Sequence, residues 1–414
     1  MRVEKNVPEI RFEGFSGEWE ERLLGSLCLI GDIDHRMPES KTTGIPYLMT
    51  GDFYGINGLD FSRAKLISIE DYEQLSKKIK PEFGDILFAR YASVGAVRYV
   101  ETDTKFLISY SCAILKTNNT TYGKYLFYFF QTERTQGQLE LDINTGSQRN
   151  IGIDSLKSLL VVLPKPAEQT AIGNTFQKLD NLINQHQQKH DKLSNIKKAM
   201  LEKMFPKQGE TIPEIRFKGF SGEWKEVSLS DFGVATSGTS IESEFTKDGK
   251  YKVISIGSYS ENSVYTEQGI RASLSPKTES RVLNKNDLTM ILNDKTLAGN
   301  IIGRVLLVDE DDSYVYNQRT QRIEPSSEYN PQFLYQFLNA PSVRKRIFKA
   351  SQGNTQIYVN WSAISKLKYF IPKKDEQTAI GNYFQKLDAL INQHQQQITK
   401  LNNIKQACLS KMFV

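Results

Sequence analysis

The chain has 414 residues, of which 39% are hydrophobic and 24% are charged, a composition typical of folded proteins with two or more domains. No apolar stretch reaches the roughly 20 residues of a membrane-spanning helix, and the first residues lack the apolar core of a signal peptide. We therefore expect a cytoplasmic protein that contacts no membrane. The net charge of +5 and the three widely spaced cysteines exclude a uniformly basic surface, a disulfide framework and a cysteine-rich zinc site.

The chain contains an internal repeat. Residues 8–19 return at 213–224 with one substitution. Residues 168–205 align without gaps on residues 376–413, and 29 of these 38 positions are identical. Between the matched segments the two halves differ almost completely. The sequence therefore predicts two variable modules that alternate with two constant segments.

In the first variable module, residues 86–89 and 96–100 read as two strands joined by a polar turn. The aromatic stretch at 125–130 predicts a short helix packed against a core. The second module repeats these features at residues 288–292, 303–308 and 333–338. We expect a mixed sheet with a short helix in each module.

The constant segments predict long helices, because they lack internal proline and place apolar residues four and three positions apart. The narrow stripe predicts a coiled coil, and an antiparallel, pseudo-two-fold arrangement follows because the first helix ends where the second module begins. The expected core of this spacer consists of Ile172, Phe176, Leu179, Ile183, His186, Leu193, Ile380, Phe384, Leu387, Ile391, His394 and Leu401.

Prolines before each helix and a polar breaker after the first helix mark the boundaries of these parts. We expect a first module at residues 1–165, a helix at 166–206, a second module at 207–372 and a second helix at 373–414. The predicted fold class is α+β, with two mixed α/β modules separated by two long antiparallel helices.

The sequence contains no complete catalytic, cofactor or metal motif, and no Gly-x-x-x-x-Gly-Lys-Ser/Thr loop for phosphate binding. Residues 330–333 differ by Gln332 from the loop with which amino-methyltransferases hold a flipped adenine, and a helix start explains them better. Asp85, Asp103 and Lys105 match the residue types of a metal-dependent nuclease motif. However, two aspartates and a lysine at such spacings are common by chance in a charged chain of this size.

His186 and His190 have the spacing of zinc ligands on one helix face, yet no third ligand lies in the segment. Both lie on the coiled-coil stripe, so a polar layer of the helix pair is the better interpretation. We therefore predict no catalytic residue and no bound metal.

Together, the repeat and its motifs resemble the specificity subunit of type I restriction-modification systems, in which two variable target-recognition domains alternate with two near-identical helical regions. The resemblance spans essentially the whole chain. It rests on the duplicated segment at 8–19, the strand start Gly84-Asp85-Ile86-Leu87, the turns at Gln148 and Gln356, and the pairs Glu168-Gln169 and Glu376-Gln377 that open the helices. The second domain departs from the pattern with Asn286-Asp287-Leu288, where glycine is usual.

The resemblance implies a protein without chemistry of its own. It would read an interrupted double-stranded DNA sequence, one part per domain. It would also hold two methyltransferase subunits and, in the full complex, the motor and nuclease subunits. S-adenosylmethionine, ATP and Mg²⁺ would be bound by these partners, so this chain would carry no cofactor.

Two sets of residues are then expected to contact DNA, although solvated charged faces are the alternative for the charge clusters. Cations that would neutralise phosphates are Lys77, Lys78, Lys80, Arg344 and Arg346. Loop side chains that would reach base edges are Arg90, Tyr91, Ser93, Ser147, Gln148 and Arg149 in the first module, and Asn293, Lys295, Thr296, Asn300, Thr355, Gln356 and Tyr358 in the second.

A coiled-coil adaptor with two protein-binding globular ends would share the duplication and the helices. However, an adaptor with two different ends has little reason to keep both parts of its spacer alike, whereas two identical partner subunits need two identical docking surfaces. The preferred hypothesis is therefore a non-catalytic DNA specificity subunit.

Overall fold

The computed structural model describes residues 6–146, 149–295 and 297–414. Contacts within the chain divide it into two compact units. Unit 1 consists of the chain up to Gln187 together with Gln395–Val414, and unit 2 consists of Gln188–His394. No helix in the described part of the chain is both long enough and apolar enough to span a membrane.

Unit 1 contains the first variable module. Its elements, in chain order, are β1 (Glu20–Leu23), α1 (Leu24–Leu27), β2 (Cys28–Gly31), β3 (Ile45–Leu48), η1 (Thr50–Asp52), β4 (Phe53–Tyr54), β5 (Gly58–Leu59), β6 (Lys65–Ile67), α2 (Ile69–Leu75), β7 (Ile86–Ala89), β8 (Val97–Tyr99), β9 (Leu107–Ile108), β10 (Cys112–Thr117), α3 (Gly123–Phe129), α4 (Glu133–Leu141), α5 (Ile153–Ser158) and β11 (Leu160–Leu163). The central sheet is antiparallel in the order β2-β10-β7-β8. A second sheet, β6-β3-β9, is mixed, because β3 and β9 are parallel.

Unit 2 contains the second variable module. Its elements are β12 (Lys225–Ser228), η2 (Leu229–Phe232), β13 (Gly233–Ser237), η3 (Glu242–Glu244), β14 (Tyr251–Ile254), η4 (Ile256–Ser258), β15 (Arg271–Ala272), α7 (Pro276–Glu279), β16 (Leu288–Ile291), β17 (Asn293–Asp294), β18 (Val305–Leu307), β19 (Tyr314–Tyr316), β20 (Thr320–Pro325), α8 (Pro331–Asn339), α9 (Pro341–Lys349), β21 (Ile357–Tyr358), α10 (Trp361–Ile364) and β22 (Lys368–Ile371). The central sheet β13-β20-β16-β18 and the mixed sheet β15-β14-β19 repeat the topology of unit 1. The divergent sequences therefore share one fold, which confirms the predicted mixed sheets.

The central sheets of the two units begin in the same way. Gly84 and Asn286 precede β7 and β16 with positive φ angles of 93° and 73°. Asparagine is among the few residues that tolerate this left-handed conformation, so Asn286 replaces glycine without changing the path of the backbone. Asp85 and Asp287 follow, and each accepts a hydrogen bond of 2.7 Å from the backbone N–H three residues earlier.

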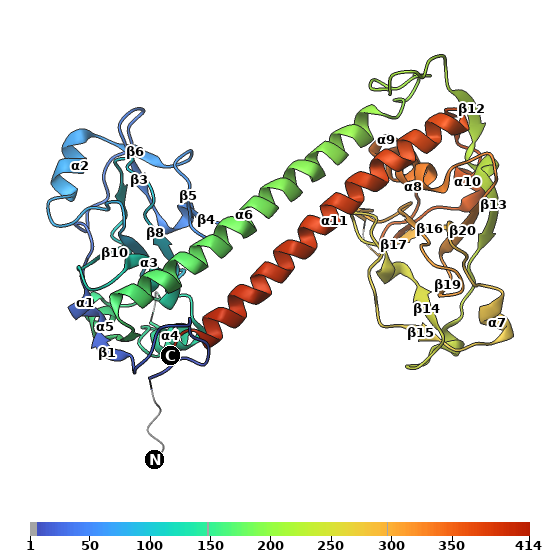
Figure 1. Ribbon diagram of the computed structural model, residues 1–414. Helices are drawn as coiled ribbons and strands as arrows, with labels where there is room; N and C mark the ends of the chain where they lie inside the picture. The colour runs from blue at the N-terminus through green and yellow to red at the C-terminus, as the bar shows by residue number, and fades with distance from the viewer. Residues whose placement is uncertain (1–5, 147–148, 296) are drawn as a thin grey trace. The chain divides into compact units, whose positions relative to one another are not determined.

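The two constant segments form the helices α6 (Pro166–Lys203) and α11 (Lys374–Lys411), as the sequence predicts. Within unit 1 the first part of α6 packs against the end of α11, where the ring centroids of Phe176 and Phe413 are 5.7 Å apart. Within unit 2 the end of α6 packs against the first part of α11, where the rings of Phe205 and Phe384 are stacked with their centroids 6.0 Å apart. The helices are therefore antiparallel in each unit. Figure 1 shows α6 in green and α11 in red.

The duplicated segment at 8–19 joins these helices to the module of unit 1. Arg11 donates two hydrogen bonds of 2.7 Å to the carboxylate of Glu168, and the N–H of Ile10 donates to the carbonyl of Lys411 at 3.0 Å. Unit 2 repeats these contacts with the residues Arg216, Glu376, Ile215 and Lys203. The duplicated segment therefore makes the same contacts with the long helices in both units, and this set of contacts is called the joint below.

The apolar stripe of the long helices is most deeply buried beside the aromatic helices α3 and α8. The ring centroids of Phe176 and Tyr128 of α3 are 5.0 Å apart. Phe384 belongs to the same core cluster as Phe333 and Phe337 of α8. Among the residues expected in the spacer core, the buried ones are Ile172, Phe176, Ile183, Ile380, Phe384 and Leu387. The half-buried ones are Leu179, His186, Leu193, Ile391, His394 and Leu401.

Candidate nucleic-acid interface

Loop A follows the strand β7 in unit 1 and β16 in unit 2. It comprises residues 90–94 in unit 1 and 292–302 in unit 2. In each unit the loop ends at a glycine with positive φ, Gly95 or Gly303, whose N–H donates back to the last residue of the strand. The two versions of loop A therefore have the same base, but the loop in unit 2 is six residues longer.

Loop B comprises residues 145–151 in unit 1, apart from residues 147 and 148, which the structure does not describe, and residues 353–359 in unit 2. Each loop B lies against loop A of its own unit through backbone hydrogen bonds. The N–H of Ile151 donates to the carbonyl of Arg90 at 3.0 Å. In unit 2 the equivalent bond, from Val359 to Leu292, is 2.9 Å. Both units thus present the same pair of adjoining loops.

Most residues predicted to reach base edges lie in these paired loops. In unit 1 these are Tyr91, Ser93 and Arg149, with Arg90 at the base of loop A. In unit 2 they are Asn293, Lys295, Asn300, Thr355, Gln356 and Tyr358. The side chains of Ser93, Arg149, Lys295, Asn300, Thr355, Gln356 and Tyr358 are exposed, whereas Tyr91 and Asn293 are half-buried. Ser147, Gln148 and Thr296 lie outside the described residues.

Arg90 is buried, with only 6% of its surface exposed. Its Nη1 donates to the carboxylate of Asp32, and its Nε donates to the carbonyl of Ile151 at 3.0 Å. The guanidinium therefore holds loop A against loop B. The corresponding residue in unit 2 is Leu292, which packs against the core, so this ion pair is specific to unit 1.

Asp32 is a buried residue that the sequence did not single out. Besides Arg90, it interacts with Nε2 of His35 at 3.0 Å and accepts a hydrogen bond from Nζ of Lys78 at 3.2 Å. Burial opposes ionisation of this carboxyl. The bonds from His35 and Lys78 and the charge of Arg90 outweigh that effect and hold its pKa below the ordinary value. No local pattern marks Asp32 as an ion-pair residue, because its cationic partners Lys78 and Arg90 are 46 and 58 residues away in the sequence.

The three predicted lysines of unit 1 lie on the connection between α2 and β7, and all are exposed. Lys78 is held by Asp32, and Lys80 lies 3.3 Å from Glu82. Lys77 lies on the same connection. Since Asp32 also holds Arg90, this basic connection is attached to the base of loop A.

The predicted cations Arg344 and Arg346 of α9 have different neighbours. Nη2 of Arg344 donates to the carbonyls of Asn300 and Ile302, at 3.0 and 3.1 Å, so Arg344 lies against loop A. Arg346 instead lies over the ring of Tyr369, 4.4 Å from its centroid, and donates to the carbonyl of residue 368. The sequence treated the two arginines alike, and the structure separates them.

The rejected catalytic motifs have structural roles. Asn330 accepts a hydrogen bond of 2.9 Å from the N–H of Phe333 and caps α8, which confirms the helix start. Asp85 pairs with Lys116 at 2.6 Å, while Lys105 lies over the ring of Tyr72. Within the described ranges, no three His, Cys, Asp or Glu side chains form a group that could hold a metal ion.

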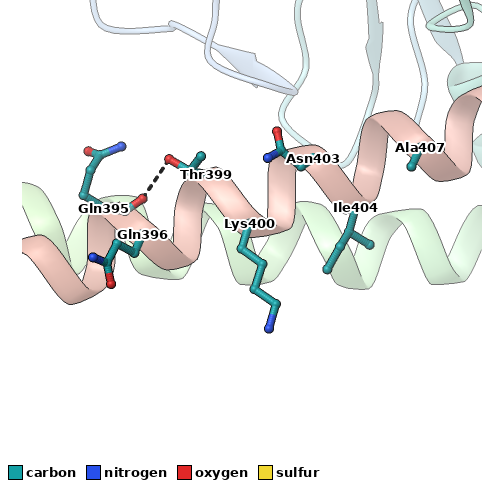
Figure 2. A pocket seen from close by; sticks show the side chains of 7 residues that line it. All are labelled: Gln395, Gln396, Thr399, Lys400, Asn403, Ile404 and Ala407. Atoms are coloured by element: carbon teal, nitrogen blue, oxygen red, sulfur yellow. Dashed lines mark hydrogen bonds between the residues drawn. The ribbon is translucent and has the colours of Figure 1, made fainter. Parts of the chain in front are cut away.

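A different kind of surface lies on α11. An open hollow of about 570 Å³ runs along one helix face, and Figure 2 shows the seven side chains that line it: Gln395, Gln396, Thr399, Lys400, Asn403, Ile404 and Ala407. At the equivalent positions of α6, only Asp191 differs, in place of Thr399. The chain therefore repeats a helix face that is largely exposed.

Further identical residues of the two helices are also exposed. Leu182 and its equivalent Leu390 are each 43% exposed, although leucine normally contributes to a core. Lys192 and Lys400 are exposed as well. Folding of the chain alone does not explain why exposed residues are identical in both copies.

The model of the family "Type I restriction modification DNA specificity domain" matches residues 16–195 and 221–403. The chain is 23% identical over 299 residues to the Type I restriction enzyme MjaVIII specificity subunit of Methanocaldococcus jannaschii, covering 70% of this chain and 69% of the relative. It is 28% identical over 201 residues to the Type I restriction enzyme HindI specificity subunit of Haemophilus influenzae, covering 46% of this chain and 41% of the relative.

The fold is similar to the crystal structure of a type I restriction-modification S subunit from M. genitalium, with a TM-score of 0.65, 17% identity and 99% of both chains covered. The family match covers most of the chain and both modules, which favours the specificity subunit over the adaptor. In this family the subunit is non-catalytic, and the cofactors are carried by partner subunits. The chain belongs to the family of type I restriction-modification specificity subunits and is a DNA-recognition subunit with two target-recognition domains.

Proposed function

We propose that the two modules, residues 1–165 and 207–372, each read one part of an interrupted double-stranded DNA sequence through loops A and B. The observation that carries this proposal is the same pair of hydrogen-bonded loops in both units, with different side chains. A shared backbone would keep the loops in the same position relative to DNA, whereas the side chains would select different bases.

The exposed loop residues are the proposed base contacts, with Ser93 and Arg149 in the first module and Lys295, Asn300, Thr355, Gln356 and Tyr358 in the second. Lys77, Lys78 and Lys80 are the proposed phosphate contacts beside loop A of unit 1. Arg90 is instead a positioning residue, because its guanidinium is buried and bonded to Asp32.

The repeated helix faces of residues 166–206 and 373–414 are the proposed docking surfaces for two methyltransferase subunits. Leu182, Lys192 and the equivalent residues Leu390 and Lys400 are exposed and identical, as two copies of one partner require. Motor and nuclease subunits would join the full complex through these partners. The complex would act in the cytoplasm, where its DNA is found.

The test is to assemble the chain with its cognate methyltransferase subunits and to map every methylated site in the DNA of the host cell. We expect one interrupted sequence. Exchanging residues 8–165 for those of a related subunit should change one part of that sequence and leave the other part unchanged. Methylation without sequence preference, or a simultaneous change in both parts, would contradict the proposal.

A further inference from the structure

A cavity lies beside the longer loop A of unit 2, where Ala298, Gly299 and Asn300 contribute to its lining. The cavity has a volume of about 400 Å³ and lies between loop A, the start of α9 and residue Glu261. Its charged lining consists of Arg304, Arg344 and Lys345, with Glu261 as the single carboxylate. Three cations therefore face one anion in a small space.

Arg304 and Arg344 both donate a hydrogen bond to the backbone carbonyl of Asn300. Nε of Arg304 donates to the carbonyl of Asn300 at 3.2 Å, and Nη2 of Arg344 donates to the same carbonyl at 3.0 Å. Glu261 accepts a hydrogen bond of 2.6 Å from the side-chain amide of Asn300, and its charge acts on both arginines. Two cations are thus held close together, and Glu261 is the single carboxylate of the lining that they share.

This arrangement has an electrostatic cost. Burial, and to a smaller degree the charge of Arg304, lowers the pKa of Arg344 to about 10, and the charges of Asp294 and Glu261 only partly oppose this shift. The group remains charged at neutral pH. Nε of Arg344 is buried and has no hydrogen-bond partner within the described part of the chain. An anion in the cavity would offset the repulsion and supply acceptors for the remaining N–H groups.

The helix α9 adds to the positive potential. Its first residue, Pro341, lines the cavity, and Arg344 and Lys345 follow in the next turn. The unpaired backbone N–H groups at the start of a helix carry a partial positive charge that favours anions. Charge, cavity and helix end therefore favour the same class of ligand.

We propose that this cavity binds one backbone phosphate of the DNA strand that loop A of unit 2 contacts. The proposal rests on the proposed function and adds a phosphate site to it. Loop A carries the exposed residues Lys295 and Asn300, and Asn300 also lines the cavity. A strand that lies along the loop would therefore place its phosphates next to Arg304 and Arg344. Because the site fixes the strand relative to loop A, it would set the register of base reading in the second half of the target.

The alternative is that the two arginines only brace loop A through their bonds to backbone carbonyls. Bracing and phosphate binding have different salt dependences. Losing one phosphate contact lowers the slope of log K against log salt by about 0.9, whereas a distorted loop lowers affinity without changing that slope. The experiment therefore compares slopes as well as affinities.

The protein to test is the complex of the full chain with its methyltransferase subunits, bound to a duplex that contains the mapped target. Binding affinity is measured at several salt concentrations between about 50 and 200 mM, because the affinity of a protein with several phosphate contacts changes strongly over this range. The variants are Arg304→Gln and Arg304→Lys, which keeps the charge. The matched control is Arg271→Gln, since Arg271 also donates to two backbone carbonyls in unit 2 but lies outside the cavity.

A second arm uses duplexes in which one phosphate at a time is replaced by a neutral methylphosphonate. We expect one position in the second half of the target where neutralisation weakens the wild-type complex about tenfold and the Arg304→Gln complex less than about twofold. Arg304→Lys should retain most of the salt slope, and Arg271→Gln all of it.

Equal slopes for wild type and Arg304→Gln, together with no coupled phosphate position, would show that the arginines only brace the loop. Competition by inorganic phosphate without a coupled DNA position would assign the cavity to a free anion and would also overturn the proposal. If the complex binds no specific DNA at all, the proposed function itself fails, and this outcome is distinguishable from the other two.

Discussion

Nζ of Lys405 lies 2.8 Å from a carboxylate oxygen of Asp180, and both side chains are 7% exposed. This ion pair joins α11 to α6 within unit 1. Tyr128 of α3 donates to the other carboxylate oxygen at 2.8 Å, so one aspartate connects the module to both helices. Unit 2 contains the equivalent pair, Lys197 and Asp388, at 2.6 Å, with Gln336 in the place of Tyr128.

Breaking this ion pair in unit 1 should be costly, because removing one partner leaves an unpaired charge in a buried site. We expect Asp180→Asn to destabilise unit 1 by about 3 kcal/mol, measured by urea unfolding and by hydrogen exchange of the first part of α6. Asp388→Asn should cost less, because its ion pair is 19% and 28% exposed. The double replacement Asp180→Leu with Lys405→Met should recover most of the loss. A single variant as stable as the wild type would contradict the assignment.

The joint between the segment at 8–19 and α6 should depend on the geometry of arginine and not only on its charge. The carboxylate of Glu168 is 2% exposed and accepts two parallel hydrogen bonds from Arg11. We expect Arg11→Lys to destabilise unit 1 nearly as much as Arg11→Gln, since an ammonium cannot form the paired bonds of a guanidinium. Thermal unfolding measures both effects.

The same substitutions at Arg216 provide the matched comparison in unit 2. Hydrogen exchange should increase around residues 8–19 for the Arg11 variants and around 213–224 for the Arg216 variants. If lysine at both positions gave the same stability as arginine, a positive charge alone would be sufficient to hold the carboxylates of Glu168 and Glu376.

The position of loop A in unit 1 should depend on pH through Asp32. The folded-state pKa of this carboxyl is held below its ordinary value of about 3.9, so ionised Asp32 stabilises the folded state above that value. The stabilisation is lost as the pH falls through the depressed folded-state pKa. We therefore expect the protection factors of residues 90–94, which correct for the pH dependence of intrinsic exchange, to be constant from pH 7 to about pH 4 and to fall at lower pH.

Asp32→Asn is the control for this prediction. It removes the charge that holds Arg90, so residues 90–94 should exchange faster at neutral pH and show no further acid step. An acid step of unchanged size in the variant would assign the transition to another group.

The repeated helix faces should bind two partner subunits independently. We expect Leu182→Glu or Leu390→Glu alone to yield complexes that have lost one of two methyltransferase subunits, because a charge placed in an apolar contact opposes docking. The double variant should lose both subunits, as measured by the mass of the purified complex. Thr170→Ala and Thr378→Ala, at equivalent positions early in each helix, are controls that should retain both. Full assembly of the double variant would place the docking surface elsewhere.

The repeat, the long helices, the aromatic helices and the mixed sheets were predictable because they depend on local patterns. Apolar spacing sets helix or strand, and an offset of 208 residues relates the two helices and the two aromatic stretches. Even the departure at Asn286 proved harmless, since asparagine adopts the φ angle that glycine adopts at position 84. The same local patterns indicated the family of type I restriction-modification specificity subunits, which the family match confirms.

The roles of individual cations depended on tertiary structure. Arg90 and Asp32 are 58 residues apart in the sequence, and no spacing rule indicates that they form a buried pair. Arg344 and Arg346 are two residues apart on a short helix, yet one lies against loop A and the other over Tyr369. A charged side chain is withdrawn from DNA where it is buried against a distant partner, as Arg90 is against Asp32, and the packing of the whole module brings such partners together. The sequence therefore determined the elements and their repetition, whereas the tertiary structure decided which charged side chains are buried and which neighbours each of them has.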